Sequence, residues 1–199
     1  METPILIDLP DKLQTDRTLL RPYRSGDGQA LFEAVDESRE HILPWMPWGP
    51  GHQSPTDSEN LVRTWRARWE LREDLPIGIW DRATGQFLGG TGLHRIDWHV
   101  RSFEIGYWIR KTGQGKGHVT DAVTMLTRLA FESLKANRVF IRCAAENERS
   151  ASVARRVGYV YEGSLRNSIK DADGLLHDAM MFSLIPEEWE VLRTQNPKP

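Results

Sequence analysis

Cysteine, long apolar runs and an excess of charge of one sign are all scarce in this sequence of 199 residues. The single cysteine, Cys143, excludes an intrachain disulfide and a zinc cluster of cysteines, and it fits a reducing compartment. Because no run is long enough to span a membrane and no signal peptide is recognisable, we expect a soluble, cytoplasmic protein without membrane contact. A formal net charge of −2 argues against a dedicated nucleic-acid binder.

Metal-binding and nucleophilic patterns are also missing. The six histidines, at positions 41, 52, 94, 99, 118 and 177, show no spacing typical of metal ligands, and we expect no metal site. Cys143 lies in the apolar run "RVFIRCAA", which predicts a buried, inert thiol rather than a nucleophile.

The periodicity of apolar residues predicts strands and helices in an irregular order. We expect strands at 18–23, 76–81, 87–97, 101–110, 138–145, 159–169 and 175–185, and helices at about 25–38, 57–72, 117–135, 147–158 and 186–193. Helices interrupt the strands without strict alternation, which predicts an α+β fold with a mixed sheet of about seven strands, flanked by helices. No linker or repeat divides the chain, so we expect one domain over 1–199, with a core at about 15–190 and a frayed tail at 194–199.

A glycine-rich loop stands between a predicted strand and a predicted helix. Gly113, Gly115 and Gly117 alternate with polar residues there, in a pattern that suits an anion site at a helix N-terminus. The pattern argues against a nucleoside-triphosphate loop, because Gly117, not serine or threonine, follows Gly115 and Lys116. A dinucleotide fingerprint does not fit either, because the third glycine comes one residue early and hairpin-like strands precede the loop.

Six pieces of the chain, in order, resemble the GNAT acetyltransferase superfamily and its Rim-type branch, whose named members acetylate the N-termini of ribosomal proteins. The pieces are "LPWMPW", "EIGYW", the loop "QGKGHVTDA", "N-x-x-S" at Asn147 and Ser150, "GYVYEG" and "HDAMMFSLIPEEW". The resemblance spans about Thr15 to Trp189. The loop frame Gln114-x-x-Gly117-x-Val119 matches the superfamily pattern except at its last position, which is usually glycine or alanine.

The resemblance implies acetyl-CoA as the co-substrate, with its pyrophosphate on the glycine loop. The implied binding residues of this loop and its flank are Gln114, Gly115, Lys116, Gly117, His118, Val119, Thr120 and Asn147. Lys116 is either a direct charge contact or a solvated lysine, and His118 is either a phosphate contact or an exposed side chain. The bulk of Val119 would narrow the approach of the phosphates.

The resemblance also implies that two central strands, 104–109 and 139–145, splay apart. The pantetheine arm of acetyl-CoA would enter between them and pair with backbone groups of Tyr107, Trp108 and Ile109, like a missing strand.

Two residues are candidates for proton transfer. Glu104 lies within the apolar strand and is either the general base or a structural carboxylate bound to an arginine or to backbone. Ser150 is either the acid that protonates the CoA thiolate or, like Asn147, a cap of the helix that follows. Tyr159 and Tyr161 are alternative acids, for which packing on the sheet is the competing interpretation.

The acceptor is less constrained by the sequence. Trp45 and Trp48, in a proline-rich loop, are interpreted either as a wall of the acceptor pocket or as a plug over the core. The resemblance implies direct attack by a primary amine, either a protein N-terminal α-amine or a small molecule such as an antibiotic or metabolite. A non-catalytic acyl-CoA sensor and a nucleotide-binding protein are the remaining alternatives, and a homodimer is possible for the family.

Overall fold

The computed structural model of the chain describes residues 3–46 and 48–195. Most of the predicted frayed tail, residues 196–199, lies outside this range, whereas residues 194 and 195 belong to the last helix.

The order of elements follows the predicted order closely. The strands are β1 (Leu13–Gln14), β2 (Thr18–Pro22), β3 (Leu75–Asp81), β4 (Phe87–Asp97), β5 (Ser102–Ile109), β6 (Arg138–Ala144), β7 (Val160–Lys170) and β8 (Leu176–Leu184). The helices are α1 (Gly28–Ile42), α2 (Pro55–Leu71), α3 (His118–Arg128), α4 (Glu148–Val157) and α5 (Pro186–Gln195). Short 3-10 turns are η1 (Pro4–Leu6), η2 (Gly49–Gly51) and η3 (Lys111–Gly113), and η4 (Leu129–Ser133) is a π-helical turn.

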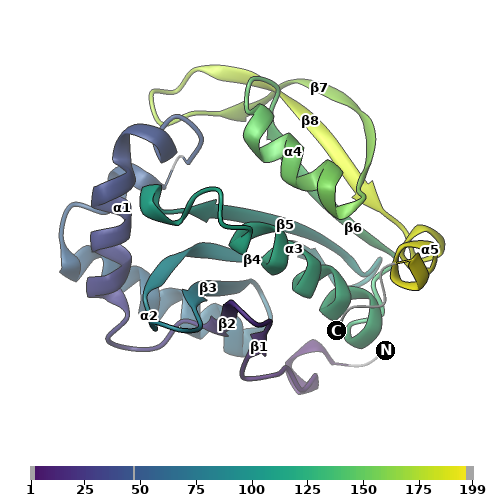
Figure 1. Cartoon of the computed structure of the whole chain (residues 1–199), viewed down its shortest axis with the longest axis horizontal. Coiled ribbons are helices and arrows are strands. Elements are labelled where there is room, and N and C mark those ends of the chain that lie inside the picture. Colours follow the sequence, from purple (N-terminus) through teal and green to yellow (C-terminus); the bar gives the residue numbers. More distant parts are fainter. Residues whose placement is uncertain (1–2, 47, 196–199) are drawn as a thin grey trace.

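All eight strands form one sheet, in the order β1-β2-β3-β4-β5-β6-β8-β7 (Figure 1). Neighbouring strands are antiparallel except β5 and β6, which are parallel. The predicted α+β fold with a mixed sheet is therefore confirmed, and the strand absent from the prediction is β1. Its two residues are too few to show an alternating pattern.

The parallel pair separates soon after it begins. Its registered pairs are Ser102↔Arg138, Phe103↔Val139 and Glu104↔Phe140, and the residues that the structure describes add none beyond these. Both strands nevertheless continue, to Ile109 and to Ala144. Figure 1 shows β5 and β6 meeting near α5 and diverging toward α1. The predicted splayed pair is confirmed.

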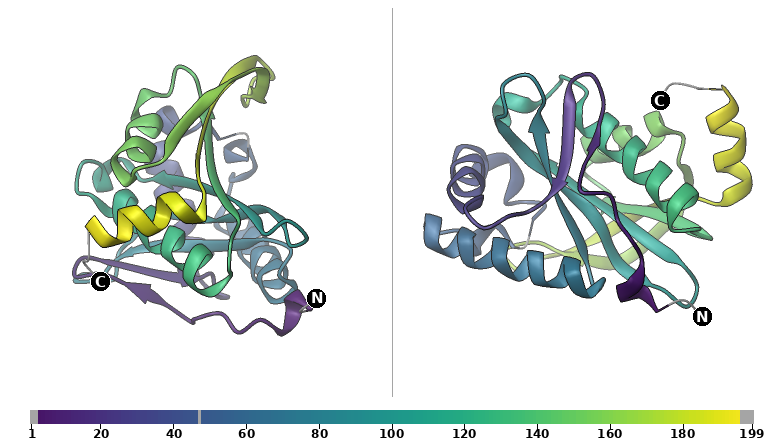
Figure 2. Two further views of the ribbon diagram at one scale, coloured as in Figure 1. Left: turned by 90° about the vertical axis from the view of Figure 1, so that its right-hand side faces the viewer. Right: turned by 90° about the horizontal axis from the view of Figure 1, so that it is seen from below.

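Strand alternation gives the sheet two faces with different cover. Phe103 and Ile105 of β5 join the core beneath α3 and α4, whereas Trp108 joins a second cluster beneath α1 and α2. Figure 2 shows α2 and α3 on opposite sides of the central strands. Glu104 and Gly106 share the face of Trp108, where the α1–α2 layer does not cover them completely. This uncovered area of β4 and β5 is where the candidate site lies.

One predicted helix changes its geometry partway. The run expected at 117–135 is α-helical to Arg128 and then forms the π-helical turn, in which the amide of Leu134 donates to the carbonyl of Leu129 at 3.1 Å. None of the helices in the described ranges is long and apolar enough to cross a membrane.

Candidate active site

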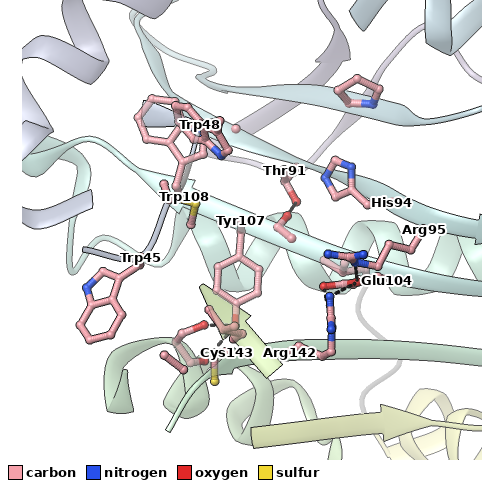
Figure 3. A pocket seen from close by; sticks show the side chains of 18 of the residues that line it. Trp45, Trp48, Thr91, His94, Arg95, Glu104, Tyr107, Trp108, Arg142 and Cys143 are labelled. Carbon is pink, nitrogen blue, oxygen red and sulfur yellow. Dashed lines mark hydrogen bonds and ion pairs between the residues drawn. The ribbon is translucent and has the colours of Figure 1, made fainter. Parts of the chain in front are cut away.

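A cleft of about 670 Å³ opens over β4 and β5 and continues into the gap between β5 and β6. Its walls come from the tryptophan-rich loop, α2, strands β3 to β6, the start of α4 and the β7–β8 hairpin. Figure 3 shows Trp45, Trp48 and Trp108 toward one end and His94, Arg95 and Glu104 toward the other. The cleft therefore combines an aromatic end, a charged end and access to the splayed strands.

The main chain of β5 faces the gap at alternate residues. The amide of Arg110 donates to the carbonyl of Leu88 on β4 at 2.7 Å, so alternation turns the backbone of Trp108 toward β4 as well. The backbone groups of Tyr107 and Ile109 face the gap instead. This corrects the expectation for Trp108, whose side chain, not its backbone, reaches the cleft.

Tyr107 and Ser150 are joined by two hydrogen bonds. The Tyr107 hydroxyl donates to the Ser150 carbonyl at 2.8 Å and accepts from the Ser150 hydroxyl at 3.1 Å. Asn147 Oδ1 accepts from the Ser150 amide at 3.1 Å, so Asn147 caps α4 as one alternative expected. Burial raises the pKa of Tyr107 and that of the neighbouring Cys143 thiol. The hydroxyl pair lies beside the gap, and Tyr107 is a proton-transfer candidate that the sequence analysis missed.

The other two tyrosines considered as acids lie elsewhere. Tyr159 is buried and shares a 2.7 Å hydrogen bond with Thr127, whereas Tyr161 is exposed and bonds Ser164 at 2.9 Å. Neither is among the residues that line the cleft. Cys143 is buried, as predicted, although it reaches the wall of the cleft.

Glu104 lies in the cleft with both carboxylate oxygens bound. Arg95 Nε is 2.7 Å from Oε2, and Arg142 contacts both oxygens at 3.2 and 3.3 Å. Figure 3 shows the carboxylate between the two guanidinium groups. This geometry matches the structural alternative for Glu104, and its role as general base stays a prediction.

His94 is next to Glu104 on the same wall (Figure 3). The two residues are paired in the β4–β5 register, and His94 Nδ1 lies 2.6 Å from Oδ1 of Asp74, just before β3. In the sequence His94 is one of six scattered histidines. Only the register and the fold reveal its acidic partner.

The glycine loop follows directly from the end of β5 but does not line the cleft. Gly115 and Gly117 have φ angles of +73° and +84°, a left-handed conformation that glycine adopts most readily. A Cβ atom on Gly117 would lie 2.6 Å from a terminal nitrogen of Arg17, which pairs with Asp121 of α3 at 2.8 Å. Arg17 thus brings a positive charge to the loop, and the sequence analysis did not identify it.

Side chains on the first turn of α3 differ from the expectations. His118 is buried, not exposed, and its Nδ1 lies 2.9 Å from the Thr18 hydroxyl, so its ring is not free to contact a phosphate. Val119 is half-buried and packs against the core. The side chain of Lys116 is exposed. The Thr120 hydroxyl accepts a hydrogen bond from the Arg156 guanidinium at 3.4 Å.

Trp45 and Trp48 both line the cleft, so the structure places them where a pocket wall was predicted. Trp48 also packs against the core, with its ring 5.6 Å from that of Trp108. Tyr23 and Trp65, with ring centroids 4.8 Å apart, extend the same aromatic wall. Trp48 thus has both of the predicted positions, since it lines the cleft and also packs on the core.

Glu37 of α1 fastens the segment between β5 and the glycine loop. Its carboxylate accepts from the Arg110 guanidinium, from the Thr112 amide at 3.0 Å and from the Thr112 hydroxyl at 2.8 Å. The Arg110 hydrogen bond, followed by those of Thr112, outweighs burial and lowers the pKa of Glu37 to about 2. The loop is therefore held to α1 by a carboxylate that stays charged well into the acid range.

We expect Glu37→Gln to destabilise the protein by about 2 kcal/mol at neutral pH, because hydrogen bonds to a charged group are lost. Since the pKa of Glu37 in the folded protein is below its ordinary value of 4.5, the contribution is complete above about pH 4.5 and disappears toward pH 2. Urea unfolding from pH 7 to pH 2.5 measures this difference. Glu40→Gln, an exposed change on the same helix, is the control, and a difference that persists at pH 2.5 would contradict the assignment.

The parted strands and the glycine loop at a helix start define a coenzyme A-dependent acyltransferase architecture, and comparison with known proteins gives the family. The Acetyltransferase (GNAT) domain family matches residues 17–160. The chain belongs to this family, and it is an acetyl-CoA-dependent N-acetyltransferase. The resemblance noted in the sequence is confirmed.

Individual relatives come from the Rim-type branch. The chain is 34% identical over 172 residues, 86% of its length and 92% of the relative's, to YdaF of Bacillus subtilis, provisionally named a ribosomal N-acetyltransferase. It is 25% identical over 189 residues, 89% of its length and 92% of the relative's, to the ribosomal protein uS5-alanine N-acetyltransferase of Escherichia coli. The structure of Mycobacterium smegmatis RimJ in complex with CoA-disulfide is similar with a TM-score of 0.76 and 26% identity, covering 86% of this chain and 83% of that one.

Proposed function

We propose that this N-acetyltransferase transfers the acetyl group of acetyl-CoA to the α-amine at the N-terminus of a cytoplasmic protein. The observation that carries the proposal is the continuous cleft, which joins the gap between β5 and β6 to an open aromatic chamber beside β4. The names of YdaF and of the uS5-alanine enzyme support a ribosomal protein as the acceptor.

The parted strands and the glycine loop suit acetyl-CoA. The backbone groups of Tyr107 and Ile109 face the gap and would pair with the pantetheine arm, as an added strand pairs with a sheet edge. Beyond β5 the chain leads into the glycine loop, where amides at the start of α3 favour a bound anion. Lys116 and Arg17 would add positive charge for the pyrophosphate.

The hydroxyl pair of Tyr107 and Ser150 is the proposed proton source for the departing thiolate. It lies where the gap meets the cleft, and α4 holds it through the Asn147 cap. Because the Ser150 hydroxyl donates to the Tyr107 hydroxyl, the two hydroxyls would act as one relay, and Ser150 would have the role predicted for it.

The chemistry of the reaction favours an acceptor amine that loses its proton easily, because only the neutral amine can attack. A lysine amine is only about 0.1% neutral at physiological pH, whereas roughly a quarter of α-amines are neutral. Trp45 and Trp48 would form the wall against which the first side chains of a peptide pack.

The proposal is tested with three sets of acceptors and mass spectrometry of the products. The first set is lysine-free peptides that begin with alanine, serine or methionine, the second is N-terminally blocked peptides with one lysine, and the third is small primary amines. We expect the free α-amines to react at least about tenfold faster in kcat/KM, because their pKa is lower. Turnover of small amines alone would contradict the acceptor class, and acetyl-CoA binding without any turnover would favour the sensor alternative.

A further inference from the structure

We propose that His94, oriented by Asp74, is the general base that takes the proton from the acceptor amine. The proposal rests on the proposed function, because it assigns a step of that reaction to a residue of the same cleft. It differs from the role predicted for Glu104, which lies on the neighbouring strand.

The Asp74 contact sets which ring nitrogen of His94 is basic. Nδ1 lies 2.6 Å from the carboxylate, which can only accept a hydrogen bond when ionised, so Nδ1 carries the hydrogen. Nε2 then holds the free lone pair. Within residues 3–46 and 48–195, no donor or acceptor is bonded to Nε2, and the side chain is 32% exposed. The ring thus presents a lone pair to the cleft.

Two glycines form the floor on which this ring lies. A Cβ atom on Gly92 would be 2.8 Å from Nε2, and one on Gly106 would be 3.4 Å from it. Nε2 is therefore held directly over the β4–β5 pair, beside Gly106. The next residue, Tyr107, faces the gap proposed for the pantetheine arm, so Nε2 lies in the same cleft into which that gap opens.

Glu104 is the less suitable base on the same wall. Arg95 and Arg142 occupy both of its oxygens, and a proton taken from an amine would have to compete with two guanidinium groups. The ion pairs also compensate the charge of Glu104 next to His94. The other ionisable groups that line the cleft are Tyr23, Tyr107, Cys143, Lys170 and Asp171.

The proposed step balances in atoms and charge. The neutral amine attacks the thioester carbonyl, a C–N bond forms, and the π electrons of the C=O bond move to oxygen. The tetrahedral intermediate therefore holds a negative oxygen and a positive nitrogen, and the C=O bond forms again when the C–S bond breaks. His94 Nε2 takes one proton from this nitrogen, the C–S bond breaks, and the CoA thiolate is protonated through Tyr107 and Ser150. His94 then releases its proton to solvent, and the hydroxyl pair of Tyr107 and Ser150 takes up one proton from solvent, which restores both groups.

The test compares His94→Gln with Glu104→Gln and with His99→Gln, an exposed histidine in the turn after β4. The substrate is the fastest peptide among those beginning with alanine, serine or methionine. We expect His94→Gln to lower kcat by at least about 100-fold with little change in the KM for acetyl-CoA, and its residual rate to rise steadily with pH. His94→Ala should regain activity on addition of imidazole, and His99→Gln should behave like wild type.

Asp74 is a positioning residue, and its test is the state of the ring. ¹⁵N NMR of the free protein should show hydrogen on Nδ1 of His94, and Asp74→Asn should shift the tautomer mixture, whereas Asp74→Glu should restore part of kcat. This measurement needs no acceptor.

The outcomes separate the two proposals. A wild type that acetylates no peptide contradicts the proposed function, whatever the tautomer is. An active wild type overturns the role of His94 if His94→Gln keeps more than about a third of kcat, and a large loss in Glu104→Gln alone would return the base to Glu104. Hydrogen on Nε2 instead of Nδ1 in the free protein would also overturn it.

Discussion

Replacing Gly117 by alanine is expected to weaken acetyl-CoA binding by about 100-fold, which corresponds to about 2.7 kcal/mol. Two effects add at this position. A side chain at φ +84° is strained, at a cost of about 1–2 kcal/mol. The new Cβ atom would also lie 2.6 Å from a terminal nitrogen of Arg17 and would displace the guanidinium that Asp121 holds. The loop would lose both its backbone shape and its neighbouring charge.

Gly115→Ala separates these two effects. Gly115 has φ +73°, but no described atom lies within 4 Å of a Cβ placed there. Strain of about 1 kcal/mol alone predicts a loss of roughly fivefold. Calorimetric titration of acetyl-CoA into wild type and both variants, with Tm as the control for folding, measures the difference. Equal losses would exclude a role for Arg17, and wild-type affinity in both variants would exclude this loop as the anion site.

Local patterns account for what the sequence predicted well. Strand β6 is a short apolar run, and the glycine loop stands between a strand and an amphipathic helix. Both features can be recognised from residues that are neighbours in the sequence. The splayed pair came from the family resemblance, and the register of three pairs between β5 and β6 confirms it.

The charged groups of the site have no such local signal. Arg17 meets Asp121 across 104 positions of the chain, and Glu37 meets Arg110 across 73. Glu104 lies in an apolar strand and thus resembles a desolvated base in the sequence. Its two arginine partners come from other strands and become neighbours only through the register of the sheet.

The buried ring of His118 illustrates the same limit. In the sequence it belongs to a polar loop, which predicts exposure, but the first turn of α3 places it against β2. The Thr18 hydroxyl satisfies its Nδ1 there, and burial lowers the pKa of His118. Composition within a loop predicts burial poorly when a helix starts inside it, because the helix turns each side chain by a fixed angle.

The gap beside β5 leads to a second large expected effect. In the free protein the amides of Tyr107 and Ile109 should exchange with solvent deuterium rapidly, because β6 has no registered residue beyond Phe140 in the described ranges. If the pantetheine arm pairs with them, exchange should slow on binding acetyl-CoA. At a ligand concentration about 1,000 times Kd, slowing of up to about 1,000-fold is available from the binding free energy. Amide exchange followed by NMR, with and without acetyl-CoA, measures it.

The same strand supplies its own control. The backbone of Gly106 and Trp108 faces β4, so their amides should be protected in both states and change far less on binding. The Gly106 carbonyl also accepts from the Thr91 hydroxyl of β4 at 2.8 Å. The β4 side of β5 is therefore hydrogen-bonded whether or not the co-substrate is bound. Uniform slowing of all four amides would indicate global stabilisation instead of strand addition. Protection of Tyr107 and Ile109 in the free protein equal to that of Trp108 would mean that the gap is closed in solution, and the arm would then need another route.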